Sequence, residues 1–547
     1  MTARARIPGI VAAALTITGL VLALCGLPLL FLWAAALAAA ALLLSRWLSV
    51  GLVVAACAIG FLLIADLLLV AGSYIGFGML TAQCAAWAVI GVGAGLASAV
   101  IPARERGWSN ADRRLVLAAA SGAIVTLLLT VIGAILPGAV HIAWAMNDDS
   151  VRDLLVARQI MTTSTSIGPT PLPFGISAAN MLPGRASVPA SDLLRFDVTR
   201  MAEVWIAVAA ATCLLLGVIA ARVVRGVRAW ISIPLTIVVS LAGLGWWVIG
   251  IQLADGYLNA GFAIALLLAA WLVYLESERR PVLSLLMLCA AALAVLPIWS
   301  PMVICMAALA SVVLVRLLAR RSVRLAVLMP AALVVLALAA TLPFGIVTAA
   351  VQSNDLDKDG GFPELSTPIL FAFIAVILIV MIADAVRTGL RHLASGAIAL
   401  VVAGGIGMAY LLYQRRNSAD LLGYYPEKFS WLMAVLLGMV GITVLGSLLV
   451  RRPLVGRAAR AVLASLVVAG LGVAIVASWV SAPERVSPIF GILEGEVFGV
   501  GNADADIVFR LIDEGRKPNP AAAASNRSNE WVDYYVSRFT AATAPTP

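Results

Sequence analysis

Apolar runs of about twenty residues recur along the whole chain and are separated by shorter polar gaps. A helix of that length crosses the roughly 30 Å of hydrocarbon in a bilayer. Because lipid offers no hydrogen bonds, the backbone of a crossing segment must bond internally, which favours helices. We therefore predict an all-α polytopic membrane protein with about fifteen transmembrane helices. The expected spans are 8–25, 28–45, 50–72, 77–101, 115–137, 202–221, 229–251, 258–275, 282–297, 301–318, 325–349, 367–386, 393–413, 430–450 and 459–481.

Arginine residues gather in every second gap between these spans. The positive-inside rule assigns such gaps to the cytoplasm. We therefore expect a cytoplasmic N-terminus, an extracytoplasmic C-terminus and a multi-pass location in the plasma membrane. The basic gaps hold Arg46, Arg104, Arg106, Arg113, Arg114, Arg222, Arg225, Arg228, Arg279, Arg280, Arg316, Arg320, Arg321, Arg324, Arg387, Arg391, Arg451, Arg452, Arg457 and Arg460.

The polar gaps on the opposite, outer face are longer and divide the chain into regions. We expect N-terminal transmembrane helices over 1–137, the first of them a retained span rather than a cleaved signal. An extracytoplasmic loop follows over 138–201. The helical core covers 202–481 and carries outer loops at 351–367 and 413–431, and a small extracytoplasmic tail covers 482–547. Since loops on a rigid scaffold carry function, the outer face is the expected working face.

Composition agrees with a membrane protein and argues against a nucleic-acid partner. The chain is 63% hydrophobic and 12% charged, with a net charge of +9. Most of its basic residues lie in short gaps, where they set orientation. The six cysteines lie in or beside apolar runs, which is typical of small buried side chains rather than of disulfides or metal ligands. The expected partners include membrane lipids and exclude nucleic acid.

The loop 138–201 has recognisable local patterns. VRDLLVARQIM, from Val151, has apolar positions at helical spacing and predicts a short amphipathic helix along the membrane interface. TSIGPTPLPFG holds three prolines and predicts an extended loop. SDLLRFDVTRM predicts a helix that Ser191 caps and that runs into the next span.

Two adjacent acids, Asp148 and Asp149, stand where the chain leaves its fifth predicted span. A carboxylate that is partly desolvated near lipid gains basicity and suits a general base that deprotonates a hydroxyl acceptor. The simpler alternative is a helix cap or a solvated loop. The same stretch offers four candidate substrate-binding residues, of which the first has an interfacial structural role as its alternative. They are His141, Asn147, Arg152 and Arg158.

The stretch from His141 to Arg158 reads H-x-x-W-x-x-N-D-D-x-x-x-x-x-x-x-A-R. It is similar to the acidic loop motif of the GT-C superfamily of glycosyltransferases, of the actinobacterial type. These are polytopic membrane enzymes that take sugars from polyprenyl-phosphate donors on the non-cytoplasmic face. The resemblance implies a lipid-linked sugar donor, an envelope glycan, lipid or protein acceptor, and Asp148 or Asp149 as the catalytic base. Here the loop follows the fifth span, whereas the family usually places it after the first.

A second candidate, LLGYYPEKFSW, lies before a late span and contains Tyr424, Tyr425, Glu427 and Lys428. Aromatic residues at such a boundary commonly form an interfacial belt. The alternative is functional, since cations on the outer face run against the positive-inside trend. Lys428 would bind the donor phosphate, with Arg415 and Arg416 near the same anion. A YY-x-x-K segment here resembles a feature of actinobacterial arabinosyl- and mannosyltransferase-like proteins.

A third candidate, DLDKDG, opens like an EF-hand calcium loop, with oxygen ligands at alternate positions followed by glycine. The possible ligands of Ca²⁺ or another divalent cation are Asp355, Asp357, Asp359 and Glu364. Ser366 stands where the loop normally has its final glutamate, so a solvated acidic loop is the alternative.

Two other classes of protein remain open. A transporter, flippase or polymerase of envelope glycans or lipids would explain the many spans. Asp66, an acid inside the third predicted span, is the residue that favours this alternative. Such a protein would have helices broken at mid-depth. A non-catalytic membrane scaffold makes no use of the outer cations. The pattern favours the glycosyltransferase.

Overall fold

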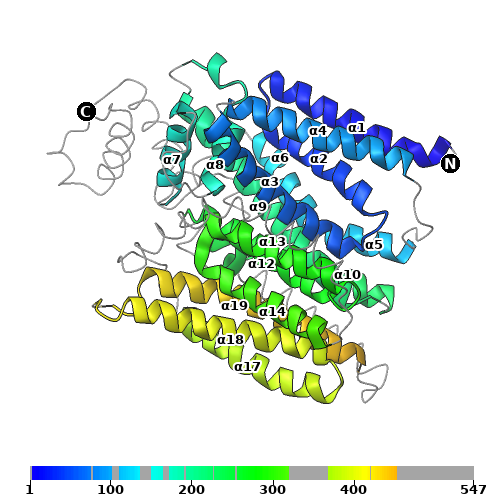
Figure 1. Cartoon of the computed structure of the whole chain (residues 1–547), viewed down its shortest axis with the longest axis vertical. Coiled ribbons are helices and arrows are strands. Elements are labelled where there is room, and N and C mark those ends of the chain that lie inside the picture. Colours follow the sequence, from blue (N-terminus) through cyan, green and yellow to red (C-terminus); the bar gives the residue numbers. More distant parts are fainter. Residues whose placement is uncertain are drawn as a thin grey trace.

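The structure is a computed structural model that describes residues 3–75, 78–101, 110–135, 149–163, 172–189, 193–225, 227–252, 256–319, 367–418 and 420–451. Every regular element in these ranges is helical, as the apolar pattern predicts (Figure 1). The helices are α1 (Ala3–Leu24), α2 (Leu29–Leu44), α3 (Val50–Ile75), α4 (Met79–Val100), α5 (Asn110–Ala119), α6 (Ser121–Ile135), α7 (Asp149–Thr163), α8 (Leu172–Met181), α9 (Leu193–Val223), α10 (Ala229–Leu241), α12 (Leu258–Glu276), α13 (Pro281–Trp299), α14 (Val303–Ala319), α17 (Thr367–Arg387), α18 (Arg391–Gln414) and α19 (Tyr424–Arg451).

Ten helical segments in these ranges are long and apolar enough to cross a membrane, and one bent pair would make an eleventh. The chain is therefore a multi-pass helical membrane protein. α2 is apolar but has only 16 residues. The predicted spans 325–349 and 459–481 lie outside the described residues.

One of the ten segments, Pro281–Ala319, is too long for a single crossing and turns back on itself. At 1.5 Å per residue its 39 residues would extend to almost twice the hydrocarbon thickness. Trp299 has extended backbone angles, with φ −158° and ψ 95°, and a 3₁₀ turn over Ser300–Met302 follows. Pro281 at the start of α13 and Arg316 near the end of α14 line the same cavity. α13 and α14 thus form the two antiparallel spans that the sequence predicts.

Burial separates central from peripheral helices. In α12, 94% of the most apolar window is buried inside the protein, whereas in α17 the share is 17%. α12 packs against α3, α9 and α13, and α17 packs mainly against α18 and α19. α17 exposes large apolar side chains such as Phe373 and Val380, which suit contact with lipid.

Glycine residues hold α1 and α4 at close range. A Cβ atom on Gly91 would lie 2.5 Å from Cγ2 of Thr16, and one on Gly95 would lie 2.7 Å from the backbone nitrogen of Ala13. The pair forms a G-x-x-x-G spacing, which lets membrane helices approach with little side-chain bulk between them. The N-terminal helices α1, α2 and α4 therefore pack as one unit (Figure 1).

Two predicted spans are broken, and the breaks meet. α5 and α6 replace the single span 115–137 and bend by 46°. α10 gives way to a 3₁₀ turn at Ala242–Leu244 and a π-helical turn at Trp246–Gly250. The Ser240 hydroxyl donates to the Ala119 carbonyl at 2.8 Å and accepts the Gly122 N–H at 2.9 Å. A serine beside one break thus satisfies backbone groups that the other break exposes.

The central helices α9 and α12 run in the same direction and so define the two ends of the bundle. Arg222 of α9 pairs with Glu276 of α12 at the end that carries the basic gaps. The opposite ends of the same helices begin near Asp197 and Tyr257. Figure 1 shows α7 and the α18–α19 turn toward its left edge, away from the N-terminus. We call the end with Arg222 and Glu276 the basic end of the bundle, and the end with Asp197 and Tyr257 the aromatic end.

Candidate functional site

Lys428 occupies a buried aromatic cluster at the aromatic end. Its side chain is 1% exposed, and its ammonium donates to the Tyr424 hydroxyl at 2.8 Å and to Oδ1 of Asn259 at 3.2 Å. Nζ also lies 3.9 Å from the centre of the Tyr257 ring. A desolvated cation over an aromatic face gains about 2 kcal/mol, which offsets part of its burial cost. The first turn of α19 and the start of α12 build this Lys428 cluster together.

Three further contacts hold the segments around this cluster together. The Trp431 indole N–H donates to the Trp247 carbonyl in the π-helical turn at 2.8 Å. The Thr367 hydroxyl, at the start of α17, donates to the Glu427 carbonyl at 3.1 Å. The ring centres of Tyr257 and Tyr424 lie 5.8 Å apart in an edge-on arrangement. These contacts position Lys428 through several elements that are distant in sequence.

The other cations of this segment have roles within the turn itself. Arg415 is fully buried, and its Nη2 donates to the Asp420 carbonyl at 2.8 Å. Gly423 leaves room for that guanidinium, because a Cβ there would lie 2.5 Å from Nη2. Arg416 is exposed and lies 4.2 Å from the Tyr413 ring centre. Arg415 shapes the turn, whereas Arg416 is open to solvent.

An acid that the sequence analysis did not single out, Asp197, joins α7 to α9. Its carboxylate has no exposed surface. Oδ2 lies 3.1 Å from Nε of Arg158 in α7, and Oδ1 lies 2.9 Å from Nε of Arg185. Arg185 also donates from Nη2 to Oδ2 at 3.1 Å, which makes a bidentate pair. Arg158, a predicted substrate-binding residue, thereby orients α7.

A second polar network lies beside this Asp197 clamp. Asn180, in the wholly buried α8, donates to Oε2 of Glu203 at 2.9 Å and accepts the Leu30 N–H at 3.2 Å. Arg200 donates to Oε1 of Glu203 at 3.0 Å and to the Gly26 carbonyl at 2.8 Å. These contacts join α8 and α9 to the α1–α2 turn. The aromatic end is thus held by paired charges that are buried or half-buried.

The remaining candidates are only partly placed. α7 begins at Asp149 and contains Arg152, and it confirms that the stretch from Val151 is a short helix. Asp148, Asn147 and His141 lie outside the described residues. So do all four possible calcium ligands, Asp355, Asp357, Asp359 and Glu364. Elsewhere, within the described ranges, no group of three His, Cys, Asp or Glu side chains could hold a metal ion.

One local expectation was wrong. The sequence TSIGPTPLPFG predicts an extended loop, yet its last four residues, from Leu172 to Gly175, belong to α8. Its first seven residues lie outside the described ranges. Pro173 is tolerated because the first helical turn needs no N–H from it. All ten residues of α8 are buried, so tertiary packing selects the helix.

Sequence reasoning also missed the polar partners of these residues. Nothing in the local sequence pattern of Asn259 indicates that it contacts a lysine 169 positions away. Asp197 could have been suspected, because it is a carboxylate at the start of an apolar run with arginines in the preceding loop.

No family model, curated protein or solved structure matches the chain. Its function must be inferred from its own residues.

Proposed function

We propose that the chain is a membrane glycosyltransferase of GT-C type. It would move a sugar from a polyprenyl-phosphate donor to an envelope glycan, lipid or protein acceptor on the extracytoplasmic face. The single observation that carries this proposal is the Lys428 cluster. A buried cation surrounded by tyrosines, at the end of an apolar span, suits a phosphate that arrives through the membrane.

The chemistry divides between the two candidate regions. The hydroxyl oxygen of the acceptor forms a bond to the anomeric carbon, while the bond from that carbon to the phosphate oxygen breaks. The phosphate leaves with the electron pair, so a cation such as Lys428 stabilises the charge that develops. The proton of the hydroxyl passes to Asp148 or Asp149 as general base.

Ring surfaces support a carbohydrate ligand in the same place. Tyr424 and Tyr425 are half-buried and lie 4.9 Å apart in an edge-on arrangement. Side chains with an apolar ring and a polar tip suit a ligand with alternating C–H and hydroxyl faces. Arg416, in the α18–α19 turn, is exposed and gives an incoming anion a second cation near Lys428.

Lys428→Gln tests the donor site. Removing a charge-assisted contact to the phosphate is expected to raise the KM for the lipid-linked donor about tenfold to a hundredfold. The measurement is sugar transfer in detergent-solubilised membranes, with radiolabelled polyprenyl-phosphate hexose and pentose as probes. Tyr424→Phe keeps the ring but removes the hydroxyl, and a smaller increase is expected.

Arg279→Gln is the matched control, because this exposed arginine lies at the basic end. It should transfer sugar at the wild-type rate. If the wild-type chain transfers neither sugar, or if Lys428→Gln matches the wild type with both donors, this proposal is wrong.

The broken helices favour one second candidate, a flippase or transporter of lipid-linked glycans. Helices interrupted at depth are typical of transport proteins, and the α5–α6 bend and the α10 break meet at Ser240. Asp66, which is 3% exposed and has one carboxylate oxygen without a hydrogen-bond partner, adds a buried acid.

Gly122→Ala tests that second candidate. A Cβ at this position would lie 2.4 Å from the Ser240 carbonyl oxygen, so the junction of the two breaks must shift. In proteoliposomes, a fluorescent polyprenyl-phosphate sugar should become accessible to an external quencher several-fold more slowly with Gly122→Ala than with the wild type. Equal rates in wild-type and protein-free vesicles would exclude transport of this probe.

A further inference from the structure

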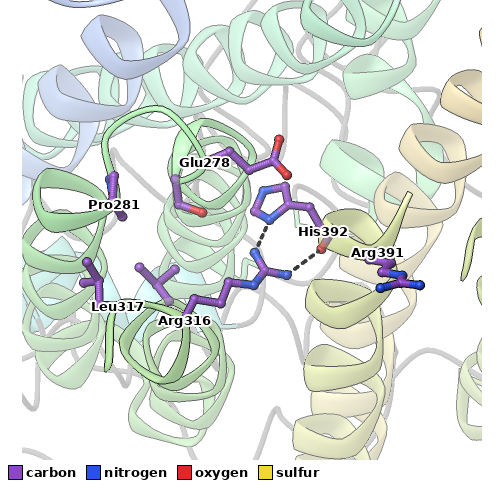
Figure 2. Close-up of a pocket in the computed structure, with 8 residues that line it drawn as sticks. Glu278, Pro281, Arg316, Leu317, Arg391 and His392 are labelled. Atoms are coloured by element: carbon purple, nitrogen blue, oxygen red, sulfur yellow. Dashed lines mark hydrogen bonds between the residues drawn. The ribbon is translucent and has the colours of Figure 1, made fainter. Parts of the chain in front are cut away.

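A basic cavity opens at the end of the bundle opposite the Lys428 cluster. It consists of two hollows of about 220 Å³ each, and both are lined by Glu278 and His392. The first hollow lies between the α12–α13 turn and the end of α14, and the second between the end of α9 and the α17–α18 turn. Figure 2 shows Arg316 and His392 pointing toward each other across the first hollow, with Glu278 beside them.

Cations outnumber acids around both hollows. Arg316 and Arg391 line the first, and Arg222 and Arg225 line the second. Glu278, which is exposed, is the acid that both share. Nε of Arg222 lies 2.5 Å from Oε1 of Glu276, so this pair neutralises one of the four arginines and leaves three against Glu278. The lining thus retains an excess of positive charge for an anion.

His392 orients one of these arginines. Its ring stacks on Tyr274 with the centres 4.6 Å apart, and Nε2 lies 3.0 Å from the Tyr274 carbonyl oxygen. That contact requires the proton on Nε2, so Nδ1 is free to accept a hydrogen bond from Arg316. Arg316 also donates to the Ser395 hydroxyl. The guanidinium is therefore positioned before any ligand arrives.

Two helix starts add backbone donors. α13 begins at Pro281 and α18 at Arg391, both on the cavity wall. Leu390, the N-cap of α18, provides no capping side chain for the first-turn N–H groups. Uncapped amides and the positive end of the helix dipole favour an anion at this place.

We propose that this cavity binds a phosphate group. An arginine guanidinium can donate two parallel hydrogen bonds to two oxygens of one phosphate, whereas a lysine ammonium acts as a point charge. Leu317 and Leu390 give the walls an apolar component beside the arginines. A phosphate can be delivered by an anionic lipid headgroup at the membrane surface or by a soluble phosphate compound, and the cavity chemistry is the same for both.

The test uses the full chain in nanodiscs of phosphatidylcholine, with and without phosphatidylglycerol. Inorganic phosphate and glycerol phosphate serve as the soluble probes. We expect thermal stabilisation by at least one phosphate source, and about tenfold weaker binding in Arg225→Gln and in Arg391→Gln. Arg391 is exposed, so its substitution should leave the fold intact.

Arg279→Gln is the control, since it removes the same charge from the same end outside the cavity lining. Loss of binding only for phosphatidylglycerol identifies a lipid ligand, and loss only for the soluble probes identifies a soluble one. Either result supports the site. Absence of binding in the wild type, or an equal loss in Arg279→Gln, overturns it, because general surface charge would then explain any attraction.

Discussion

Asparagine at whichever of Asp148 and Asp149 is the catalytic base is expected to lower the rate of sugar transfer by about 10²-fold to 10⁴-fold. Under the proposed mechanism one of these carboxylates removes the proton of the acceptor, and general base catalysis contributes an effect of that size. Asparagine keeps the shape but cannot take the proton. The measurement is kcat with saturating lipid-linked donor, compared between the two single variants.

The two variants should differ from each other. The base should lose most of its kcat, while the neighbouring acid should mainly alter KM or stability. Asp420→Asn is the control, because this exposed acid belongs to the α18–α19 turn and its side chain accepts the Leu422 N–H. Full activity in both Asp148→Asn and Asp149→Asn would remove these residues from the mechanism.

Asp197→Ala is expected to lower the free energy of unfolding by about 3 kcal/mol. The substitution leaves Arg158 and Arg185 without their buried carboxylate, and breaking a buried ion pair from one side costs an amount of this order. Both guanidinium groups retain about a fifth of their exposure, which keeps the cost at the lower end. Unfolding by denaturing detergent, followed by circular dichroism, measures the change.

The single variants Arg158→Gln and Arg185→Gln separate this effect from simple loss of charge. Each single variant leaves Asp197 with one arginine partner, so the free energy of unfolding is expected to fall by about 1 kcal/mol. In the double variant it should fall by more than the sum of the two single losses. Glu278→Ala provides an exposed acid for comparison. A loss below about 1 kcal/mol in Asp197→Ala would mean that the clamp behaves as a surface pair.

The helical class and most spans could be predicted because lipid imposes one length and one hydrogen-bonding pattern on every crossing. The reversal between α13 and α14 was also predictable, since it follows from the length of the apolar run. The bend between α5 and α6 was not. Its cause is the pairing of Ala119 and Gly122 with Ser240, which is more than a hundred residues away.

The candidate site was predictable in its residue types but not in its partners. Lys428 could be identified because the positive-inside pattern assigns its boundary to the outer face, where a cation is unexpected. Its contacts with Asn259 and Tyr257 depend on how α12 packs beside α19, and local sequence carries no record of that packing. The same holds for the pairing of Arg158 with Asp197.

The hydrogen bonds that close the α1–α2 turn also constrain how the chain is made. The Leu30 N–H needs Asn180, and the Gly26 carbonyl needs Arg200. Ribosomes add about 5 to 20 residues each second, so the first two helices wait roughly 10 to 30 s for these partners. During that interval the Leu30 N–H and the Gly26 carbonyl lack the partners that they have in the folded protein. The α1–α2 turn therefore reaches its final hydrogen-bonded form only after α8 and α9 have been synthesised.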